Sequence, residues 1–367
     1  MKRLGQLDRY VLSRTLSGVG VALLVITALI TLIQFEELSK TVGGRSDAGV
    51  AELFYLTALK VPGLVLLLLP FVFLFGGIGA YVALNRRSEL IAMRAAGISA
   101  WSFILPSASA ALIIGALVVG IANPLAANLS ERFEIERARM TEGYLSTVPK
   151  DVWLRQGDDA SLTVIHAKLR EYDHGSVLLK GVSLFIYRKD PTGHLQFSRR
   201  MEAKQARLEP GHWQLTDVRE ASAGQNSIHS DSLSLRSTLD SEAAMDRFSS
   251  TEAVSFWNLP KAISETELAG FSAKAYRLRF QQLLATPVLF AAMAILAAAF
   301  SLRLTRLGGL APLAGAGAGI GFLIFFFNQV SSALAGANFI PIVLGAWAPS
   351  LVALLSGLTL LCYTEDS

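Results

Sequence analysis

Long apolar stretches occupy both ends of the chain, and a polar stretch separates them. Each apolar stretch is near or above the roughly 20 residues that a helix needs to cross about 30 Å of hydrocarbon. The pattern therefore predicts six transmembrane helices, three before and three after the polar stretch. Their ranges are Val11–Phe35, Val61–Leu84, Trp101–Ala122, Leu283–Leu302, Leu310–Leu334 and Ile340–Tyr363. A large soluble protein with buried helices is a poor alternative, because Gly63–Gly79 contains no charged residue.

The polar stretch Asn123–Ser272 has the alternation expected of β-strands. Apolar and polar residues alternate in Ser161–Leu169 and in Val177–Arg188. Turn sequences that contain proline and glycine follow at Asp190–Gly193 and Glu209–His212. Short strands separated by such turns are typical of a β-sandwich or jelly roll. The expected fold is an α-helical membrane protein with six transmembrane helices (3+3) and an inserted β-jelly-roll domain.

Basic residues predict the orientation, since lysine and arginine collect on the cytoplasmic side of transmembrane helices. They cluster before the first span, between the second and third spans, and after the fourth span. These residues are Lys2, Arg3, Arg9, Arg14, Arg86, Arg87, Arg94, Arg303 and Arg306. All of them fall on one side if every apolar stretch crosses once. We therefore expect both termini to be cytoplasmic and the β-domain to lie outside. The expected domains are residues 1–123, 124–272 and 273–367.

Composition and motifs exclude several classes of function. The net charge of +4 fits basic cytoplasmic loops better than nucleic-acid binding. The single cysteine, Cys362, excludes an intrachain disulfide. The chain has no G-x-x-x-x-G-K-[ST] loop, and its five histidines lack metal-ligand spacing. We therefore assign no catalytic residue and no metal ligand. Gly315–Gly321 has GxxxG spacing within an apolar stretch, which indicates close helix packing.

The connection between the second and third spans carries the first candidate site. Its sequence predicts a short amphipathic helix at about residues 86–98, ended by Gly97. Glu89 is acidic in a basic segment, which an anionic membrane surface does not explain. A membrane-surface loop is one interpretation, and a coupling helix that docks on a soluble partner is the other. The residues of that candidate are Arg86, Arg87, Ser88, Glu89, Leu90, Met93 and Arg94.

A second group of basic residues lies near the expected outer face, where the orientation rule disfavours them. Contact with lipid headgroups explains any single member. As a set they fit a ring that binds an anionic amphiphile, because phosphates prefer arginine and lysine. The members are Lys40, Arg45, Lys60, Arg132, Arg137, Arg139, Lys274, Arg277 and Arg279.

The order of parts and several motifs resemble the LptF/LptG family of lipopolysaccharide export permeases. The resemblance rests on Leu7-Asp8-Arg9-Tyr10, Leu69-Pro70-Phe71, Arg87-Ser88-Glu89-Leu90, Ala96-Gly97-Ile98-Ser99, Asn123-Pro124 and Pro287. It covers essentially the whole chain, is strongest from Leu7 to Pro124 and weak in the β-domain, and is closer to the LptG branch.

The resemblance implies a mechanism and a set of partners. Two paralogous permeases, this chain and an LptF-like one, enclose a cavity in the bacterial inner membrane. A cytoplasmic ATPase dimer (LptB-like) uses ATP and Mg and drives the coupling helices, with Glu89 paired to one of its arginines. This chain itself binds no cofactor and is not an enzyme. Lipopolysaccharide enters from the outer leaflet and passes through the periplasmic β-jelly roll to a membrane-anchored protein and a periplasmic bridge (LptC/LptA-like). No nucleic acid is involved.

The same resemblance suggests which residues bind lipopolysaccharide: Gln34, Lys40, Arg45, Lys60, Arg132, Arg137, Lys274 and Arg277. LptG members often carry a basic residue near the end of the first span, where this chain has Gln34. Two explanations are open: a substrate with a different anionic pattern, or compensation by Lys60. Two other classes of protein also remain. A mechanotransmitting ABC permease usually has four spans with its outer domain after the first, and a membrane scaffold would bind no ATPase.

Overall fold

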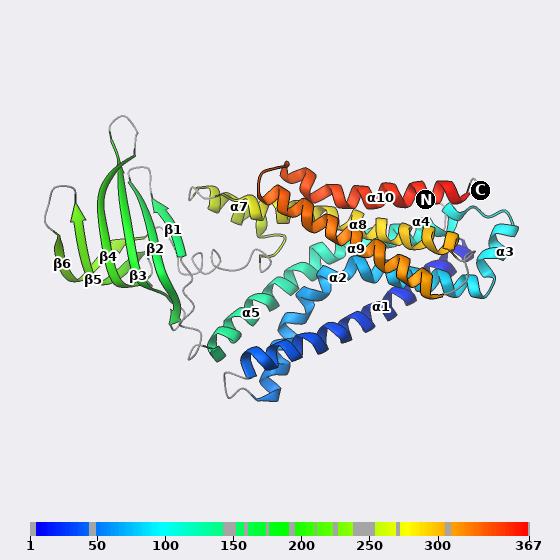
Figure 1. The fold of residues 1–367 in the computed structure, drawn as a ribbon, viewed down its shortest axis with the longest axis horizontal. Helices are drawn as coiled ribbons and strands as arrows, with labels where there is room; N and C mark the ends of the chain where they lie inside the picture. Colours follow the sequence, from blue (N-terminus) through cyan, green and yellow to red (C-terminus); the bar gives the residue numbers. More distant parts are fainter. Residues whose placement is uncertain are drawn as a thin grey trace. The chain divides into compact units, whose positions relative to one another are not determined.

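A computed structural model gives the fold. It describes residues 5–43, 49–141, 152–157, 161–173, 176–190, 195–209, 211–222, 227–237, 254–268, 272–304 and 310–365. The first half contains α1 (Gln6–Leu38), η1 (Ser39–Gly43), α2 (Val50–Arg86), α3 (Glu89–Ala95), α4 (Ala100–Leu117), η2 (Val118–Ala122) and α5 (Asn123–Thr141). After the strands come α7 (Leu259–Leu268), α8 (Lys274–Leu304), α9 (Leu310–Gly336) and α10 (Ile342–Glu365) (Figure 1).

Six of the described helices are long and apolar enough to cross a membrane. They run over Gln6–Gly43, Val50–Arg86, Ala100–Arg137, Lys274–Leu302, Gly315–Gly336 and Ile342–Tyr363. Three precede the strands and three follow them, so the predicted 3+3 layout with an inserted β-domain is confirmed. The third helix continues without interruption past residue 123, where the sequence placed a domain boundary.

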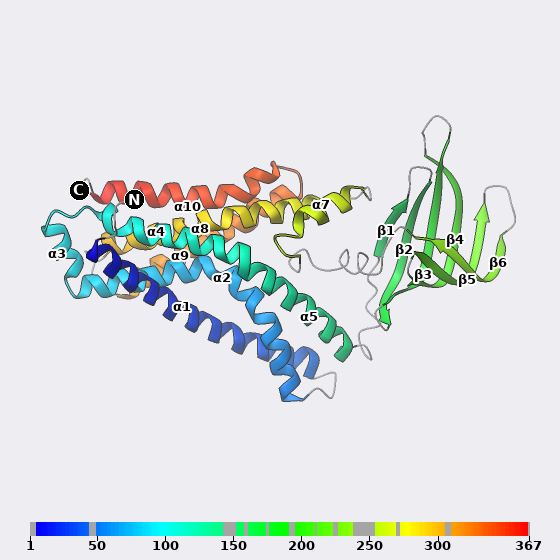
Figure 2. The same cartoon turned by 180° about the vertical axis from the view of Figure 1, so that it is seen from behind.

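The chain divides into two compact units. The helical unit comprises Met1–Glu136, Thr251–Pro260 and Lys274–Ser367, and the β unit comprises Arg137–Ser250 and Lys261–Ala273. Within the helical unit, α8 packs against α2, α4, α9 and α10, and α1 packs against α2 (Figure 2). Alanines between Ala291 and Ala299 let these neighbours approach α8 closely, since small side chains favour close packing of membrane helices.

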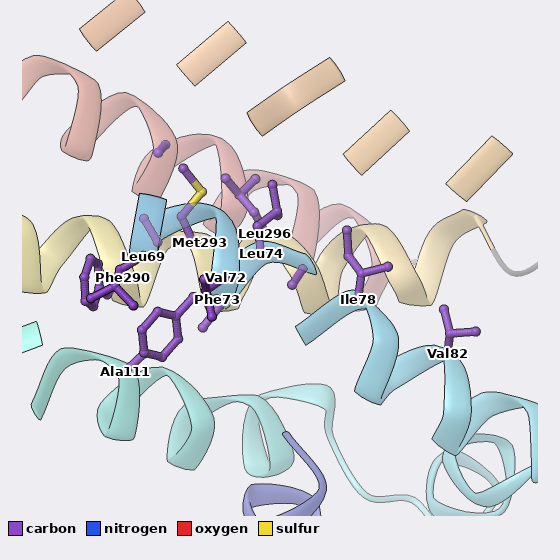
Figure 3. Packing of buried hydrophobic residues seen from close by; sticks show 14 residues of the cluster. Leu69, Val72, Phe73, Leu74, Ile78, Val82, Ala111, Phe290, Met293 and Leu296 are labelled. Carbon is purple, nitrogen blue, oxygen red and sulfur yellow. The ribbon is translucent and has the colours of Figure 1, made fainter. Parts of the chain in front are cut away.

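The centre of the helical unit is an apolar cluster built from four helices. Phe73 of α2 and Phe290 of α8 lie with ring centroids 4.8 Å apart. Leu69, Val72, Met293 and Leu296 surround them, and Ala111 of α4 closes one side (Figure 3). These side chains are almost fully buried, so their packing fixes α2 and α4 against α8.

The β unit contains one six-stranded antiparallel sheet. Its strands are β1 (Val152–Gly157), β2 (Ser161–Asp173), β3 (Ser176–Lys189), β4 (Leu195–Glu209), β5 (His212–Ser222) and β6 (Ile228–Arg236). They pair in sequence order, each with the next, as a meander. The strands predicted at Ser161–Leu169 and Val177–Arg188 are confirmed within β2 and β3. Gly211, at the predicted turn before β5, has φ +79°, a conformation that glycine adopts without strain.

One face of this sheet carries the core of the β unit. Ile165, Leu184, Met201 and Leu215 come from four successive strands and are at most 1% exposed. Trp213 is fully buried among them. The alternation read from the sequence therefore corresponds to one apolar and one polar face.

Candidate functional site

The connection between α2 and α4 folds as a helix of seven residues, α3. It is shorter than the predicted helix at residues 86–98, because Ser88 has a left-handed backbone (φ +58°) that separates α3 from α2. Gly97 (φ +78°) ends it, as predicted. The N–H of Ile98 donates to the carbonyl of Met93 at 3.1 Å, and the N–H of Gly97 donates to that of Arg94 at 3.0 Å. These two bonds form a Schellman cap, which fixes the end of the helix.

One side of α3 is buried in the helical unit. Leu90 is 2% exposed and Met93 is 9% exposed. They share an apolar cluster with Val11 of α1, Phe103 of α4 and Leu361 of α10. A force on α3 would therefore reach several transmembrane helices at once. Ile91 points away from this cluster and is 60% exposed.

The polar candidates surround α3. Arg86 is the last residue of α2, and Arg87 and Ser88 form the turn before α3, all three exposed. Glu89 is half-buried, and its Oε2 is buried without a hydrogen bond from the residues that the structure describes. Arg94 lies half-buried in the last turn of α3. The segment thus has an apolar anchor on one side and charged side chains on the other.

A cavity of about 170 Å³ lies among the membrane-spanning helices. Its walls come from α2, α5, α8, α9 and α10, together with the π-helical turn η2. Most of the lining is apolar, including Leu67 and Phe71 of α2 and Phe325 of α9. Polar side chains interrupt it: Lys60, Asn123, Ser130, Arg279, Gln282, Thr286, Asn328 and Ser350. A concave, mostly apolar space with a few polar groups is the usual form of a ligand site.

Two cations reach this cavity from opposite elements. Lys60 of α2 is half-buried, and its Nζ lies 4.9 Å from the centroid of the Phe133 ring on α5. This cation–π contact compensates part of the lost hydration of the ammonium group. Arg279 enters from the N-terminal part of α8 and is also half-buried. The cavity can therefore receive an anionic group beside an apolar wall.

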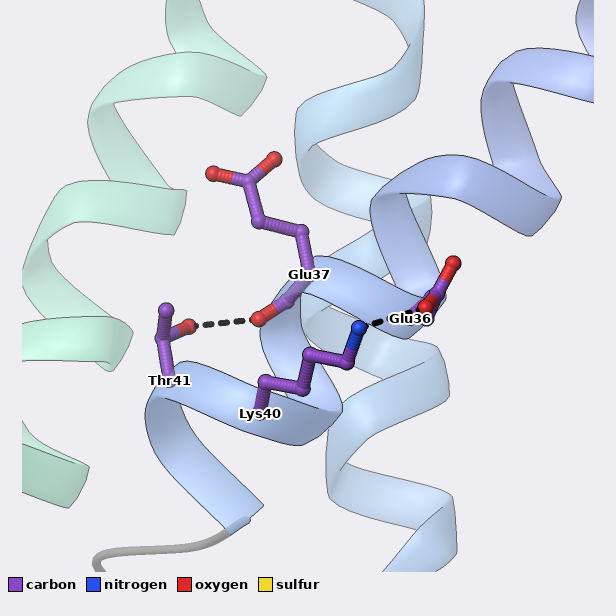
Figure 4. A network of polar contacts seen from close by, with 4 residues as sticks. All are labelled: Glu36, Glu37, Lys40 and Thr41. Atoms are coloured by element: carbon purple, nitrogen blue, oxygen red, sulfur yellow. Dashed lines mark hydrogen bonds and ion pairs between the residues drawn. The ribbon is translucent and has the colours of Figure 1, made fainter.

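The other predicted cations whose side chains the structure describes do not line this cavity. Lys40, in η1, is exposed and forms an ion pair with Glu36 at 2.6 Å, while the hydroxyl of Thr41 donates to the carbonyl of Glu37 (Figure 4). Gln34 is buried, and its Nε2 donates to the Glu37 carboxylate at 2.9 Å. The end of the first span thus holds paired charges.

The remaining candidates occupy two other elements. Arg132 is exposed and Arg137 half-buried on α5, and Lys274 and Arg277 are exposed in the first turn of α8. Arg45 lies outside the described residues. The described residues contain no group of three or more His, Cys, Asp or Glu that could hold a metal ion.

The sequence interpretation missed most of the cavity's neutral polar residues. Gln282 and Thr286 lie four residues apart on α8, so they share one helix face at the start of an apolar stretch. The spacing of these two polar residues is therefore a feature of the sequence that could have predicted a polar face on this helix. Asn328 and Ser350 come from α9 and α10, and only the packing of these helices on α8 brings them to the same space.

The segment of residues 254–258, which directly precedes α7, contacts the third span. The backbone N–H of Phe256 donates to Oδ1 of Asn123 at 2.9 Å, and the indole N–H of Trp257 donates to the carbonyl of Gly120 at 2.9 Å. Proline has no N–H to donate to the carbonyl four residues earlier, which for Pro124 is Gly120. Trp257 thus supplies the donor that Pro124 lacks.

Comparison with known proteins identifies the family. The sequence profile of the family described as "Lipopolysaccharide export system permease LptF/LptG" matches residues 9–363. The chain belongs to this family. It is 25% identical over 369 residues to the lipopolysaccharide export system permease protein LptG of Escherichia coli (strain K12), covering 98% of this chain and 99% of that protein. LptG of Haemophilus influenzae is also 25% identical, over 94% of this chain and 95% of its own length. The predicted membership of the LptF/LptG family is confirmed.

Proposed function

We propose that this chain is the permease subunit of an ATP-driven lipopolysaccharide exporter in the bacterial inner membrane. In this proposal it extracts lipopolysaccharide from the outer leaflet and passes it through its β-domain toward a periplasmic bridge. Both termini are cytoplasmic and the β-domain is periplasmic. Membership of the LptF/LptG family and the names of the relatives support the substrate.

The position of Lys60 is the observation that carries this proposal. A lysine within a membrane span is rare and usually faces a substrate path. Here Lys60 faces a cavity that also receives Arg279. The phosphate groups of lipid A would accept hydrogen bonds from these cations, and its acyl chains would contact the apolar wall. Arg132, Arg137, Lys274 and Arg277 would contact outer phosphate groups, with Lys40 and Gln34 at the end of the first span.

The small size of the cavity supports the participation of a second permease in forming the substrate site. Its volume of about 170 Å³ is below the roughly 300–1,000 Å³ of common ligand pockets and far below the size of a lipid with several acyl chains. A paralogous, LptF-like permease would complete the enclosure. Apolar side chains along α1, including Leu24, Leu29 and Leu32, are more than half exposed and offer a face for lipid or for another helix.

The α3 segment would receive the stroke of a cytoplasmic ATPase dimer. Its charged side, with Glu89 and Arg86, would contact the ATPase, and Glu89 would pair with an arginine. Leu90 and Met93 would transmit the movement, because they are packed among α1, α4 and α10. ATP and Mg belong to that partner.

The β-domain would receive the lipid after extraction. The buried face of its sheet is apolar along β2–β5, and in this proposal acyl chains enter between these side chains. Membrane-anchored and bridging β-domain proteins would accept the lipid next. A mechanotransmitting permease or a scaffold would not move lipid along this face.

Photo-crosslinking tests the proposed path. We would place p-benzoylphenylalanine at Leu67, which lines the cavity, and at Leu105, which is 60% exposed on α4 and lies away from the cavity. With the assembled transporter in membranes, ATP should produce lipopolysaccharide adducts at position 67 and few at position 105. Equal adducts at both positions, or none at 67, would reject the cavity as a substrate path. Co-purification without any ATPase would favour a scaffold.

A further inference from the structure

A second cavity lies between α1 and α2 near the end of the bundle that carries α3. It has a volume of about 560 Å³, within the roughly 300–1,000 Å³ of common ligand sites. Its walls are almost entirely apolar, with Val21 and Val25 from α1 and Phe75 from α2. Arg14 and Arg87 line it as well, together with Tyr10. It shares no lining residue with the cavity around Lys60.

The two arginines mark one end of this groove. Arg14 donates from Nε to the hydroxyl of Tyr10 at 3.2 Å, and its guanidinium lies 5.2 Å from the centroid of the Tyr10 ring. One bond uses one of five N–H donors, so the others remain for an anion. The backbone N–H of Arg87 donates to the Asn85 carbonyl, and its guanidinium has no ion pair or hydrogen bond within the part of the chain that the structure describes. Two guanidinium groups at one end fit a phosphate, which arginine binds in a bidentate manner.

The length of the groove matches one leaflet of a bilayer. Twelve residues separate Arg14 from Ile26 on α1, and twelve separate Phe75 from Arg87 on α2. At about 1.5 Å per residue, both distances are about 18 Å. Half of a hydrocarbon core of about 30 Å is about 15 Å. The groove thus runs from the headgroup region to about the membrane midplane, whereas a transmembrane helix would need a partner surface twice as long.

Glycines in the groove have two different roles. A Cβ on Gly18 would lie 2.4 Å from the Gly76 carbonyl oxygen, and a Cβ on Gly76 would lie 2.5 Å from the Cα of Val19. These two glycines therefore allow α1 and α2 to cross closely. A Cβ on Gly79 would meet no described atom within 4 Å. Helix packing does not require glycine at position 79, so the absent side chain leaves the groove open.

We infer that this groove binds an anionic glycerophospholipid of the cytoplasmic leaflet, with its phosphate at Arg14 and Arg87 and one acyl chain along Val21, Val25 and Phe75. The inference rests on the orientation given under the proposed function, in which both arginines face the cytoplasm. Basic pockets between transmembrane helices on that side are suited to anionic headgroups. The bound lipid would be a structural component of the α1–α2 pair and is distinct from the exported substrate.

Lipid retention tests the site in the complete transporter. We would reconstitute it in vesicles of phosphatidylethanolamine and phosphatidylglycerol, extract it in mild detergent and count retained lipids by native mass spectrometry. The wild-type chain should retain phosphatidylglycerol preferentially. Arg14→Gln with Arg87→Gln should lower that retention by about tenfold or more, because bonds to charged groups are lost. Gly79→Leu should lower retention of both lipids, since its side chain fills the groove.

Matched controls are available on the same helices. A Cβ on Gly20 would also meet no described atom within 4 Å, and Gly20 does not line the groove. Arg9 is exposed near Arg14 and does not line the groove either. Gly20→Leu and Arg9→Gln should therefore retain phosphatidylglycerol as the wild type does. Equal retention by the wild type and the arginine pair variant would overturn the inference.

A photo-reactive residue at Val21 distinguishes the possible occupants. An adduct with phosphatidylglycerol supports the inference. An adduct with a protein helix overturns it, and so does displacement of phosphatidylglycerol by added lipopolysaccharide, which would assign the groove to the substrate. Failure of lipopolysaccharide crosslinking at Leu67 would reject the proposed function and leave the phospholipid site standing. The Val21 assay detects a different lipid at a different position.

Discussion

Glu89 provides a test that separates coupling from folding. Its Oε2 is buried and accepts no hydrogen bond from any described residue. A buried polar atom without a partner costs about 1–3 kcal/mol, and more when it is charged. Replacing Glu89 with alanine removes that cost. The free energy of unfolding of the isolated chain should therefore stay the same or rise by about 1 kcal/mol.

The same substitution should weaken the assembled transporter. A hydrogen bond between Glu89 and an arginine of the ATPase would contribute about 1.5–3 kcal/mol, because both groups are charged. Its loss corresponds to an affinity roughly 10- to 150-fold lower. We would measure binding of the ATPase to the detergent-solubilised permease, unfolding of the permease alone, and ATP-driven lipid release from proteoliposomes. Membrane insertion should persist.

Glu52→Ala is a matched control, because Glu52 is an exposed carboxylate at the other end of α2, where its Oε2 accepts from the N–H of Gly49 at 3.0 Å. That variant should bind the ATPase normally. Two results would refute the reasoning about Glu89. A large loss of stability in the isolated Glu89→Ala chain would make Glu89 structural, and normal binding with normal lipid release would remove its coupling role.

Four further substitutions test other parts of the structure. Leu90→Ala should lower the stability of the isolated chain by about 2–5 kcal/mol in a denaturation series, because Leu90 is 2% exposed; an unchanged midpoint would contradict its packing role. Lys60→Glu should reduce lipopolysaccharide crosslinking from Leu67, whereas unchanged crosslinking would leave contact with lipid headgroups as the explanation. Gly76→Leu should reduce the yield of folded protein, since its Cβ would clash with α1, and a normal yield would argue against the close crossing. Ser183→Cys, made in a Cys362→Ser chain, should react with a membrane-impermeant maleimide added outside spheroplasts; reaction from the cytoplasm alone would overturn the orientation.

The sequence predicts the transmembrane helices well for a physical reason. A membrane span must satisfy its backbone hydrogen bonds internally, so a long apolar stretch permits only a helix there. The sequence determines the ends of these helices less well. α2 begins at Val50 rather than at Val61, because a helix continues through Glu52 and Lys60 even where the apolar stretch has not begun. The strand at Ser161–Leu169 was predictable because its apolar and polar residues alternate between the two faces of the sheet.

Details that depend on a single backbone angle or on tertiary packing were not predictable. The positive φ of Ser88 divides a segment whose periodicity suggested one helix. The cavity depends on five helices, and Asn328 of α9 meets Gln282 of α8 there only through packing. Lys60 was identifiable because it is a basic residue at the outer end of a span, where lysine and arginine are disfavoured.

The bond between Trp257 and the Gly120 carbonyl has a consequence for the order of biosynthesis. Its two residues are 137 positions apart in the sequence. At about 5–20 residues per second, a ribosome needs roughly 7–27 s to add the intervening chain. During that interval the indole N–H of Trp257 is absent, and Pro124 has no N–H to offer the Gly120 carbonyl. The third span therefore acquires this hydrogen bond only after strands β1–β6 have been synthesised.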